Sequence, residues 1–575
     1  MLSSELQADE RLNLLKNISA AGAPALTLRM LDQAQPKVDQ DLYQWILWEQ
    51  ERYSILTQWR QWDELLVRIE NLPIDIPDQF RAQAATFKAR AYLELEQPVS
   101  AREILRQQLW QDQASNYPDY ETWRQLIIIS YLKEDRVDDA RIAMVRFEQD
   151  FENDELAWLL LRARVLIDSN RHEQAIQMLE GNDAWEARAV RLFARFELNP
   201  LEFAEIWRSV NKQVKAEGTT PDERASLWAL GFYAAGNMSP VDQVVALESL
   251  FRNGVISPLE IFHVPVDELW QAYLNYAELV GNRAELLQGD DVKWLELADK
   301  AATITPVKAR SLYAKLMLES NDIEISDQAA NGYMKTFAEV DESERHLLES
   351  LFNKSEVYSN ARNIPAGIRY QLVDLALKSA DIEKATRLMS GLTTVPEGAN
   401  KLDWQLRQSR VLVLGGRYDE GNQVLESLIT DYQEPETGKT DRILQVLFDL
   451  QTVDLHRQAI THFNQLLNLE IDPGQRREIL FWIGDSYRGL EKYEQAALLY
   501  LQSAMLPASN SMDPWAQTAR FNAAESLQLA GLTDDARRIY QELLSITDDA
   551  GRRSVLSHKI QQLWLNQRAI DSVDG

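Results

Sequence analysis

Residues Arg477 to Ala508 read REILFWIGDSYRGLEKYEQAALLYLQSAMLPA, and this stretch decides the fold of the chain. Apolar residues recur in it three and four positions apart, which is the spacing of an amphipathic α-helix. Gly484 and Ala496 are small where two such helices would cross, while Tyr487 and Tyr500 are bulky beside the crossing. The stretch therefore predicts two antiparallel helices that approach each other closely.

The same arrangement recurs along the chain at a nearly constant interval. Each recurrence has a small or apolar anchor residue at the position of Ala496, usually with a bulky residue nine positions earlier. The N-terminal anchors are 36, 39 and 35 residues apart, and the C-terminal anchors are 36, 38, 37 and 40 residues apart. Two series with one period predict a repeat array. The anchors are Leu65, Ala101, Ala140, Ala175, Ala385, Gly421, Ala459, Ala496 and Ala536.

This pattern resembles the tetratricopeptide (TPR) repeat, a helix–turn–helix unit of about 34 residues with the consensus W-x2-L-G-x2-Y, A-x3-F and P. Pro507 stands near the consensus proline. The resemblance implies an all-α chain, an α-solenoid of degenerate repeats with about 25–30 helices in a right-handed superhelix. It also implies a concave groove that grips peptides or partner domains. The tyrosine-rich repeats with inserted turns are similar to those of bacterial envelope TPR proteins in outer-membrane assembly or polysaccharide export.

The regularity of the repeats divides the chain into three expected parts. Residues 1–200 form an N-terminal TPR-like array, residues 201–364 an irregular helical middle region, and residues 365–575 a C-terminal TPR array. The middle region keeps helical spacing but no clear repeat register. Residues 256–265 contain two prolines and several β-branched residues, so we expect an irregular connection there.

The composition limits the classes of function. Charged residues make up 26% and hydrophobic residues 45% of the 575 positions, as in folded soluble proteins. A net charge of −29 disfavours binding to nucleic acid or anionic lipid. It keeps an elongated surface soluble or, as the alternative, provides an acidic docking face for a basic partner. The absence of cysteine excludes disulfides, thiol nucleophiles and cysteine-bound metals.

The same absence favours a compartment where stray thiols are a hazard, such as the bacterial periplasm. The first residues, MLSSELQADER, are charged and lack the apolar core of a signal peptide. No apolar run reaches the roughly 18 residues of a membrane span. We therefore expect a periplasmic protein whose leader is absent from this sequence, with a cytoplasmic protein as the alternative.

Two glycine-containing motifs suggest chemistry only superficially. Gly438-Lys439-Thr440 resembles the end of a phosphate-binding loop, but Gln433 replaces the required first glycine, which favours an inter-repeat turn. Gly484 to Gly489 has one residue too many for a nucleophile elbow and is expected inside a helix. Carboxylates are plentiful, but no spacing singles out an acid–base pair.

Histidine and tryptophan offer weak candidates for binding. None of the six histidines forms a pair four residues apart that could hold a metal on one helical face. Four tryptophans lie close together in the sequence and are interpreted as core between repeats, with a stacking platform for a sugar or peptide as the alternative. They are Trp45, Trp48, Trp59 and Trp62.

We therefore expect a scaffold that is not an enzyme, needs no metal or cofactor, and binds a protein or peptide in its groove. One alternative is the helical superstructure of a cell-wall enzyme such as a lytic transglycosylase, although the repeats to about Trp564 leave no room for its catalytic domain. Another is a cytosolic TPR adaptor.

In TPR arrays polar residues of the first helices face the groove. The N-terminal ones are basic, which suggests an acidic peptide, a C-terminus or an anionic polysaccharide. Asn522 stands where a carboxylate clamp has an asparagine, but the full clamp is missing. The expected groove residues are Arg90, Gln125, Lys133, Arg164, Arg410, Asp485, Arg488, Asn522 and Glu525.

Overall fold

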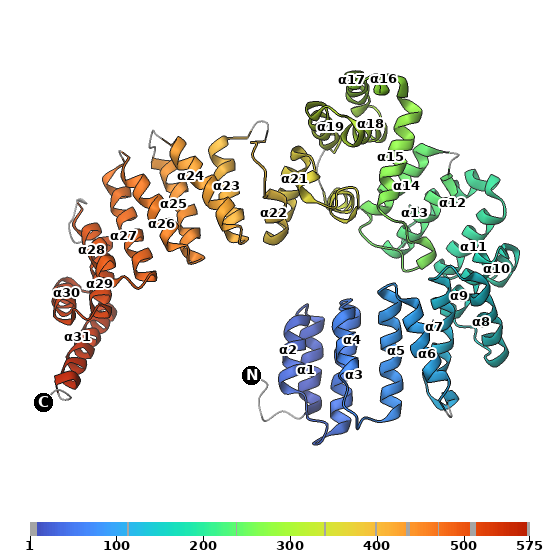
Figure 1. Ribbon diagram of the computed structural model, residues 1–575, viewed down its shortest axis with the longest axis horizontal. Coiled ribbons are helices and arrows are strands. Elements are labelled where there is room, and N and C mark those ends of the chain that lie inside the picture. The colour runs from blue at the N-terminus through green and yellow to red at the C-terminus, as the bar shows by residue number, and fades with distance from the viewer. Residues whose placement is uncertain are drawn as a thin grey trace. The chain divides into compact units, whose positions relative to one another are not determined.

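The computed structural model describes residues 8–111, 114–236, 239–337, 341–396, 399–432, 437–469, 471–506 and 513–571. Within these ranges it has 31 α-helices, several short 3-10 or π turns, and no β-strand (Figure 1). The all-α prediction is therefore confirmed, with one helix more than the expected upper number. Pro507 and the N-terminal residues 1–7 lie outside the described residues.

The chain divides into two compact units, Met1–Val264 and Pro265–Gly575. We call them unit 1 and unit 2. The irregular connection expected over residues 256–265 is confirmed, because η4 (Glu260–Phe262) is the one helical turn between α14 and α15 in this stretch. The division of the sequence into three parts by repeat register stays a prediction.

Unit 1 contains fourteen described α-helices. They are α1 (Ala8–Ala20), α2 (Pro24–Ala34), α3 (Leu42–Gln58), α4 (Trp62–Glu70), α5 (Asp78–Glu94), α6 (Pro98–Leu109), α7 (Tyr120–Leu132), α8 (Val137–Asp150), α9 (Leu156–Asp168), α10 (His172–Met178), α11 (Trp185–Leu198), α12 (Phe203–Gln213), α13 (Pro221–Ala235) and α14 (Pro240–Arg252), with the 3-10 turns η1 (Ala114–Asn116) and η2 (Pro200–Glu202).

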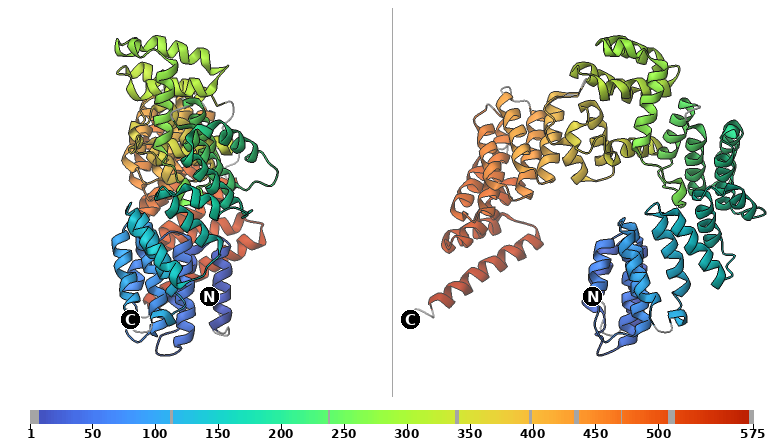
Figure 2. Two further views of the ribbon diagram at one scale, coloured as in Figure 1. Left: turned by 90° about the vertical axis from the view of Figure 1, so that its right-hand side faces the viewer. Right: turned by 45° about the vertical axis from the view of Figure 1, so that its right-hand side comes forward.

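Unit 2 contains the remaining described helices, and Figure 2 shows its stacked orange and red pairs from two further directions. They are α15 (Asp267–Val280), α16 (Arg283–Leu287), α17 (Asp291–Ala302), α18 (Pro306–Glu319), α19 (Ile323–Lys335), α20 (Glu342–Glu349), α21 (Ala366–Lys378), α22 (Ile382–Met389), α23 (Lys401–Leu414), α24 (Tyr418–Asp431), α25 (Thr437–Thr452), α26 (His456–Leu467), α27 (Pro473–Gly489), α28 (Tyr493–Met505), α29 (Pro514–Leu529), α30 (Thr533–Ile546) and α31 (Ala550–Asp571), with the π turn η5 (Ser350–Lys354) and the 3-10 turn η6 (Ala361–Asn363).

Each predicted anchor occupies one position in its helix pair. In all nine pairs the anchor is the fourth residue of the second helix, as Ala496 is in α28. All nine anchors are buried. A β-carbon on Gly484 of α27 would lie 3.1 Å from the Tyr500 ring and 3.3 Å from the Ala496 carbonyl oxygen. This confirms that small residues let the two helices cross closely.

One turn geometry joins the two helices of these nine pairs. The residue five positions before each anchor has a left-handed backbone conformation. The N–H of the residue that follows it donates a hydrogen bond to the carbonyl of the residue nine positions before the anchor, as Lys492 does to Tyr487 at 2.9 Å. This is the Schellman ending of a helix, which satisfies an otherwise unpaired carbonyl. All seven non-glycine residues with positive φ in the described part of the chain lie here. The left-handed residues are Arg60, Glu96, Asp135, Asn170, Ala380, Gly416, Asp454, Glu491 and Gly531.

First helices of successive pairs pack on one another. In unit 1 this series is α3, α5, α7, α9, α11 and α13, and in unit 2 it includes α21, α23, α25 and α27. We call the surface of these first helices the inner face of each unit. Seven of the nine expected groove residues belong to these helices or, in the case of Lys133, directly follow one, while Asn522 and Glu525 belong to α29.

The start of unit 2 has a different internal order. There α15 packs on α18 and on η5, so a helix contacts a segment about 80 residues further along the chain. An aromatic cluster fills the space between them. Trp270 contacts Phe352 and Tyr358 with ring centroids 5.5 Å apart, and Tyr333 contacts both Tyr273 and Phe352. This non-local packing involves residues 267–358, which is only part of the region 201–364 where no repeat register was expected.

Candidate protein-binding surfaces

The expected groove residues of unit 1 lie on or directly after first helices. Arg90 of α5 is exposed, and Gln125 of α7 donates a hydrogen bond to Glu121 at 3.3 Å. Lys133 follows the last residue of α7, and Arg164 of α9 pairs with Asp168 at 2.7 Å. Arg90 and Arg164 both stand eleven residues before their anchors, which gives them equivalent places in their repeats.

An irregular segment of the chain, which includes the 3-10 turn η4, packs on helices of this series. We call residues 257–263 the strap. The Ser257 hydroxyl is 2.7 Å from the Ser226 hydroxyl of α13, and Tyr233 of α13 donates to the carbonyl of His263 at 3.4 Å. The ring of Phe262 is 1% exposed. It meets Phe193 of α11 edge to face, with centroids 5.7 Å apart.

The strap also reaches the basic residues. The ammonium of Lys133 lies 2.9 Å from a carboxylate oxygen of Glu260. Burial acts to raise the pKa of Glu260, but the hydrogen bond from Lys133 and the charges of Lys133 and Arg164 outweigh it. The pKa of Glu260 therefore lies below its ordinary value, and the carboxylate is ionised at neutral pH. In this structure Lys133 thus already holds an acidic residue of the chain itself.

In unit 2 most of the expected groove residues connect one first helix to the next. Arg410 of α23 pairs with Asp449 of α25 at 2.9 Å. Arg488 of α27 pairs with Glu525 of α29 at 3.1 Å, and Glu525 also pairs with Lys559 of α31 at 2.8 Å. These partners are 34 to 39 residues apart in the sequence, which is one repeat. The charges therefore hold adjacent repeats together, in addition to any role toward a ligand.

Two further expected residues differ in their surroundings. Asp485 accepts a hydrogen bond from the Tyr500 hydroxyl at 3.0 Å. Burial, followed by the nearby Asp485 carboxylate, raises the pKa of Tyr500. Asn522 is half-buried on α29, one turn from Glu525. The groove role of these residues stays a prediction.

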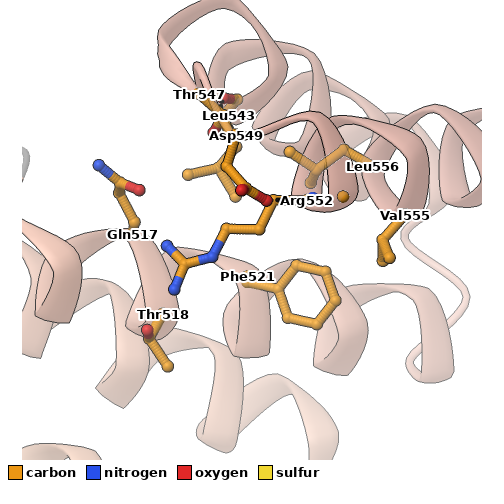
Figure 3. Close-up of a pocket in the computed structure, with 10 residues that line it drawn as sticks. Gln517, Thr518, Phe521, Leu543, Thr547, Asp549, Arg552, Val555 and Leu556 are labelled. Carbon is orange, nitrogen blue, oxygen red and sulfur yellow. Dashed lines mark hydrogen bonds between the residues drawn. The ribbon is translucent and has the colours of Figure 1, made fainter.

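A cavity of about 450 Å³ that no sequence pattern predicted lies between α29, α30 and α31 (Figure 3). Its apolar lining includes Phe521, Leu543 and Val555, and the Arg552 side chain extends toward α29. The Asp549 carboxylate accepts a hydrogen bond from the Arg552 N–H at 2.8 Å and so begins α31. The cavity exists because of how the first turns of α31 pack beside α29, which no local motif encodes.

The remaining sequence motifs fall inside ordinary structural elements. Lys439 and Thr440 lie in the first turns of α25, and the Thr440 hydroxyl is 2.8 Å from the Tyr432 hydroxyl. Gly484 is inside α27. In the described ranges no group of three or more His, Cys, Asp or Glu side chains is placed to hold a metal ion.

The four tryptophans belong mainly to the core. Trp45 and Trp48 are buried, and Trp62 packs against the cluster around Trp45. Trp59 is 49% exposed. The interpretation as inter-repeat core therefore holds for three of the four. Among the described helices, none is both long and apolar enough to cross a membrane.

The repeated pair, its common turn and its buried anchor identify the architecture. The described part of the chain is an α-solenoid whose helix pairs resemble tetratricopeptide repeats. No protein-family model matches it, and no curated protein matches it. The crystal structure of the APC/C hetero-tetramer Cut9-Hcn1 aligns at 12% identity over 89% of this chain and 95% of that chain, with a TM-score of 0.23. That of yeast Tom70 aligns at 12% identity over 85% and 96%, with a TM-score of 0.22. At such scores the assignment of the fold rests on the helix pairs themselves.

Proposed function

We propose that this chain is a non-catalytic scaffold that binds a partner protein or peptide along its inner face. The observation that supports the proposal is a set of basic residues on or beside the first helices of unit 1, in a protein of net charge −29. Arg90 and Arg164 stand at equivalent positions of their repeats, with Lys133 between their helices. Attraction to these residues at short range favours an acidic segment of the partner over a basic one.

We further propose that the scaffold serves bacterial envelope assembly or polysaccharide export and acts in the periplasm. The absence of cysteine supports this compartment, because an oxidising environment selects against unpaired thiols. Fractionation of the native host tests the location, and recovery of the protein in the cytoplasm would contradict it.

Affinity capture from the native host, with mass spectrometry, tests the binding role. The variant Arg90→Glu/Arg164→Glu reverses two inner-face charges and should lose most of the partner retrieved by the wild type, because it replaces attraction with repulsion. The matched control is Arg208→Glu/Lys212→Glu, which makes the same change of charge at exposed positions on the second helix α12. Equal recovery by both double variants would exclude the inner face of unit 1 as the site.

A further inference from the structure

The strap makes the kinds of contact that a bound peptide would make. It is an irregular segment that contains the turn η4, and along the chain Ser257 contacts α13, Glu260 contacts Lys133 at the end of α7, and Phe262 contacts α11. Phe262 supplies a buried aromatic anchor, and Glu260 supplies a carboxylate to a basic residue. Buried aromatic anchors and complementary charges are what peptide-binding grooves select for.

Only part of the strap is held firmly. The Glu260 side chain remains 44% exposed within its ion pair, and Ile256, just before the strap, is 64% exposed. Arg90 of α5 is exposed, and in the described part of the chain it forms no ion pair with the strap, whose ion pair is the one between Glu260 and Lys133. A segment that carries further acidic residues would therefore gain contacts that the strap lacks.

We propose that the ends of α7, α9, α11 and α13 form a binding surface for an extended segment with a carboxylate and, two residues later, an aromatic ring. The strap fills this surface in the free protein, and an acidic, aromatic segment of a partner protein displaces it. This inference rests on the proposed scaffold function and specifies the chemistry of its partner. Because the strap is tethered, it competes at a high effective concentration, and weakening it should raise the affinity for an external segment.

A labelled peptide of residues 255–265 (VISPLEIFHVP), followed by fluorescence anisotropy with the full chain, tests the proposal. We expect Glu260→Ala to bind this peptide about tenfold more tightly than the wild type does, because Lys133 becomes available. Glu260→Ala/Lys133→Glu should lose that gain. A peptide with glutamine in place of its glutamate should bind Glu260→Ala several-fold more weakly.

The matched control is Asp139→Ala, which removes an ion-paired carboxylate of similar exposure from the second helix α8 and should leave peptide affinity at the wild-type value. Equal affinity of wild type and Glu260→Ala would overturn the proposal, as would equal affinity of the two peptides for Glu260→Ala. Because Glu260 is partly exposed, Glu260→Ala leaves the buried ring of Phe262 in place and should not impair folding. If the peptide affinities contradict this inference while the wild type still retrieves its partner in affinity capture, the inference is wrong and the proposed scaffold function is unaffected.

Discussion

The nine regular pairs and the helices α15 to η5 differ in where a helix finds its packing partner. In a regular pair the first helix packs on its own second helix and on the next repeat, within about 40 residues. In the irregular region Trp270 packs on Phe352 and donates a hydrogen bond to the carbonyl of Leu351, 81 residues away. The regular pairs are stabilised by local contacts, whereas the irregular region depends on closing a long loop.

Both regions place small residues where helices come close, and the regular pairs share one turn as well. A regular pair uses its buried anchor and one shared left-handed turn. The irregular region uses glycine against a large ring: a β-carbon on Gly281 would overlap the indole of Trp294, and one on Gly332 would overlap the ring of Tyr313. Loops closed over long distances cost more entropy before contacts form. We therefore expect the regular pairs to fold first.

The largest effect is expected from Gly281→Ala in the irregular region. The added methyl group has to displace Trp294, which is 1% exposed and donates to the carbonyl of Asn282 at 2.9 Å. We expect a loss of about 3 kcal/mol in local stability, measured by hydrogen exchange of α15 to α18. Gly438→Ala in α25 is the control, because a β-carbon there meets nothing within 4 Å. Unchanged exchange in Gly281→Ala would show that the indole moves freely.

Ala496→Leu tests the corresponding contact in a regular pair. The larger side chain overpacks the crossing of α27 and α28, and we expect a cost of about 2 kcal/mol in urea denaturation followed by hydrogen exchange. The loss should remain within α27 to α29, since each repeat contacts only its neighbours. Leu498→Ala, at a position that is 57% exposed, serves as the control. A loss of protection reaching α15 would contradict the local character of the regular pairs.

The shared turn offers a test in both directions. Alanine at position 380 has φ of 56°, where an L-residue is strained, so Ala380→Gly should stabilise the α21–α22 pair by about 1 kcal/mol. Gly416→Ala, at the same position of the next pair with φ of 81°, should destabilise it by a similar amount. Thermal unfolding of the two variants should shift in opposite directions. Shifts of the same sign would indicate that the turn does not govern stability.

The smallest expected effect is a loss of stability at low pH. Arg477 of α27 pairs with Asp513, which begins α29, at 2.6 Å. The hydrogen bond from Arg477 is the main cause that lowers the pKa of Asp513 from 3.8 to about 2. A lowered pKa means that the stabilisation is full above about pH 4 and is lost as the pH falls toward 2. Solvent screens this pair, so we expect about 0.5 kcal/mol.

The measurement is the stability of α27 to α29 at pH 5 and at pH 2.5. The control is Asp513→Asn, which keeps a helix-capping oxygen but has no titrating group, so its stability should change less between the two pH values than that of the wild type. An equal acid response in both proteins would exclude this ion pair as a source of pH dependence.

The sequence predicted the regular pairs because their signal is local and periodic. Ala101 and Ala496 are recognisable since a small residue recurs wherever two helices cross. The shared turn was not predictable from residue type, because Arg60, Ala380 and Glu491 have no common side-chain chemistry. Only the backbone conformation unites them.

The candidate binding surfaces were predicted in part. The helical period placed Arg164 and Arg410 on first helices, but it could not identify their partners. Asp449 lies one repeat after Arg410, so a search at that distance would have found this pair. Glu260 lies in an irregular segment without periodicity, and no spacing rule connects it to Lys133.

The ion pairs one repeat apart have a mechanical consequence. Arg410 with Asp449 and Arg488 with Glu525 join successive first helices of unit 2. Extending the array would move successive first helices apart, so we expect these ion pairs to resist extension. Salt weakens the attraction within such ion pairs, since the Debye length falls from about 10 Å at 0.1 M salt to about 3 Å at 1 M. We therefore expect added salt to make the C-terminal array easier to extend.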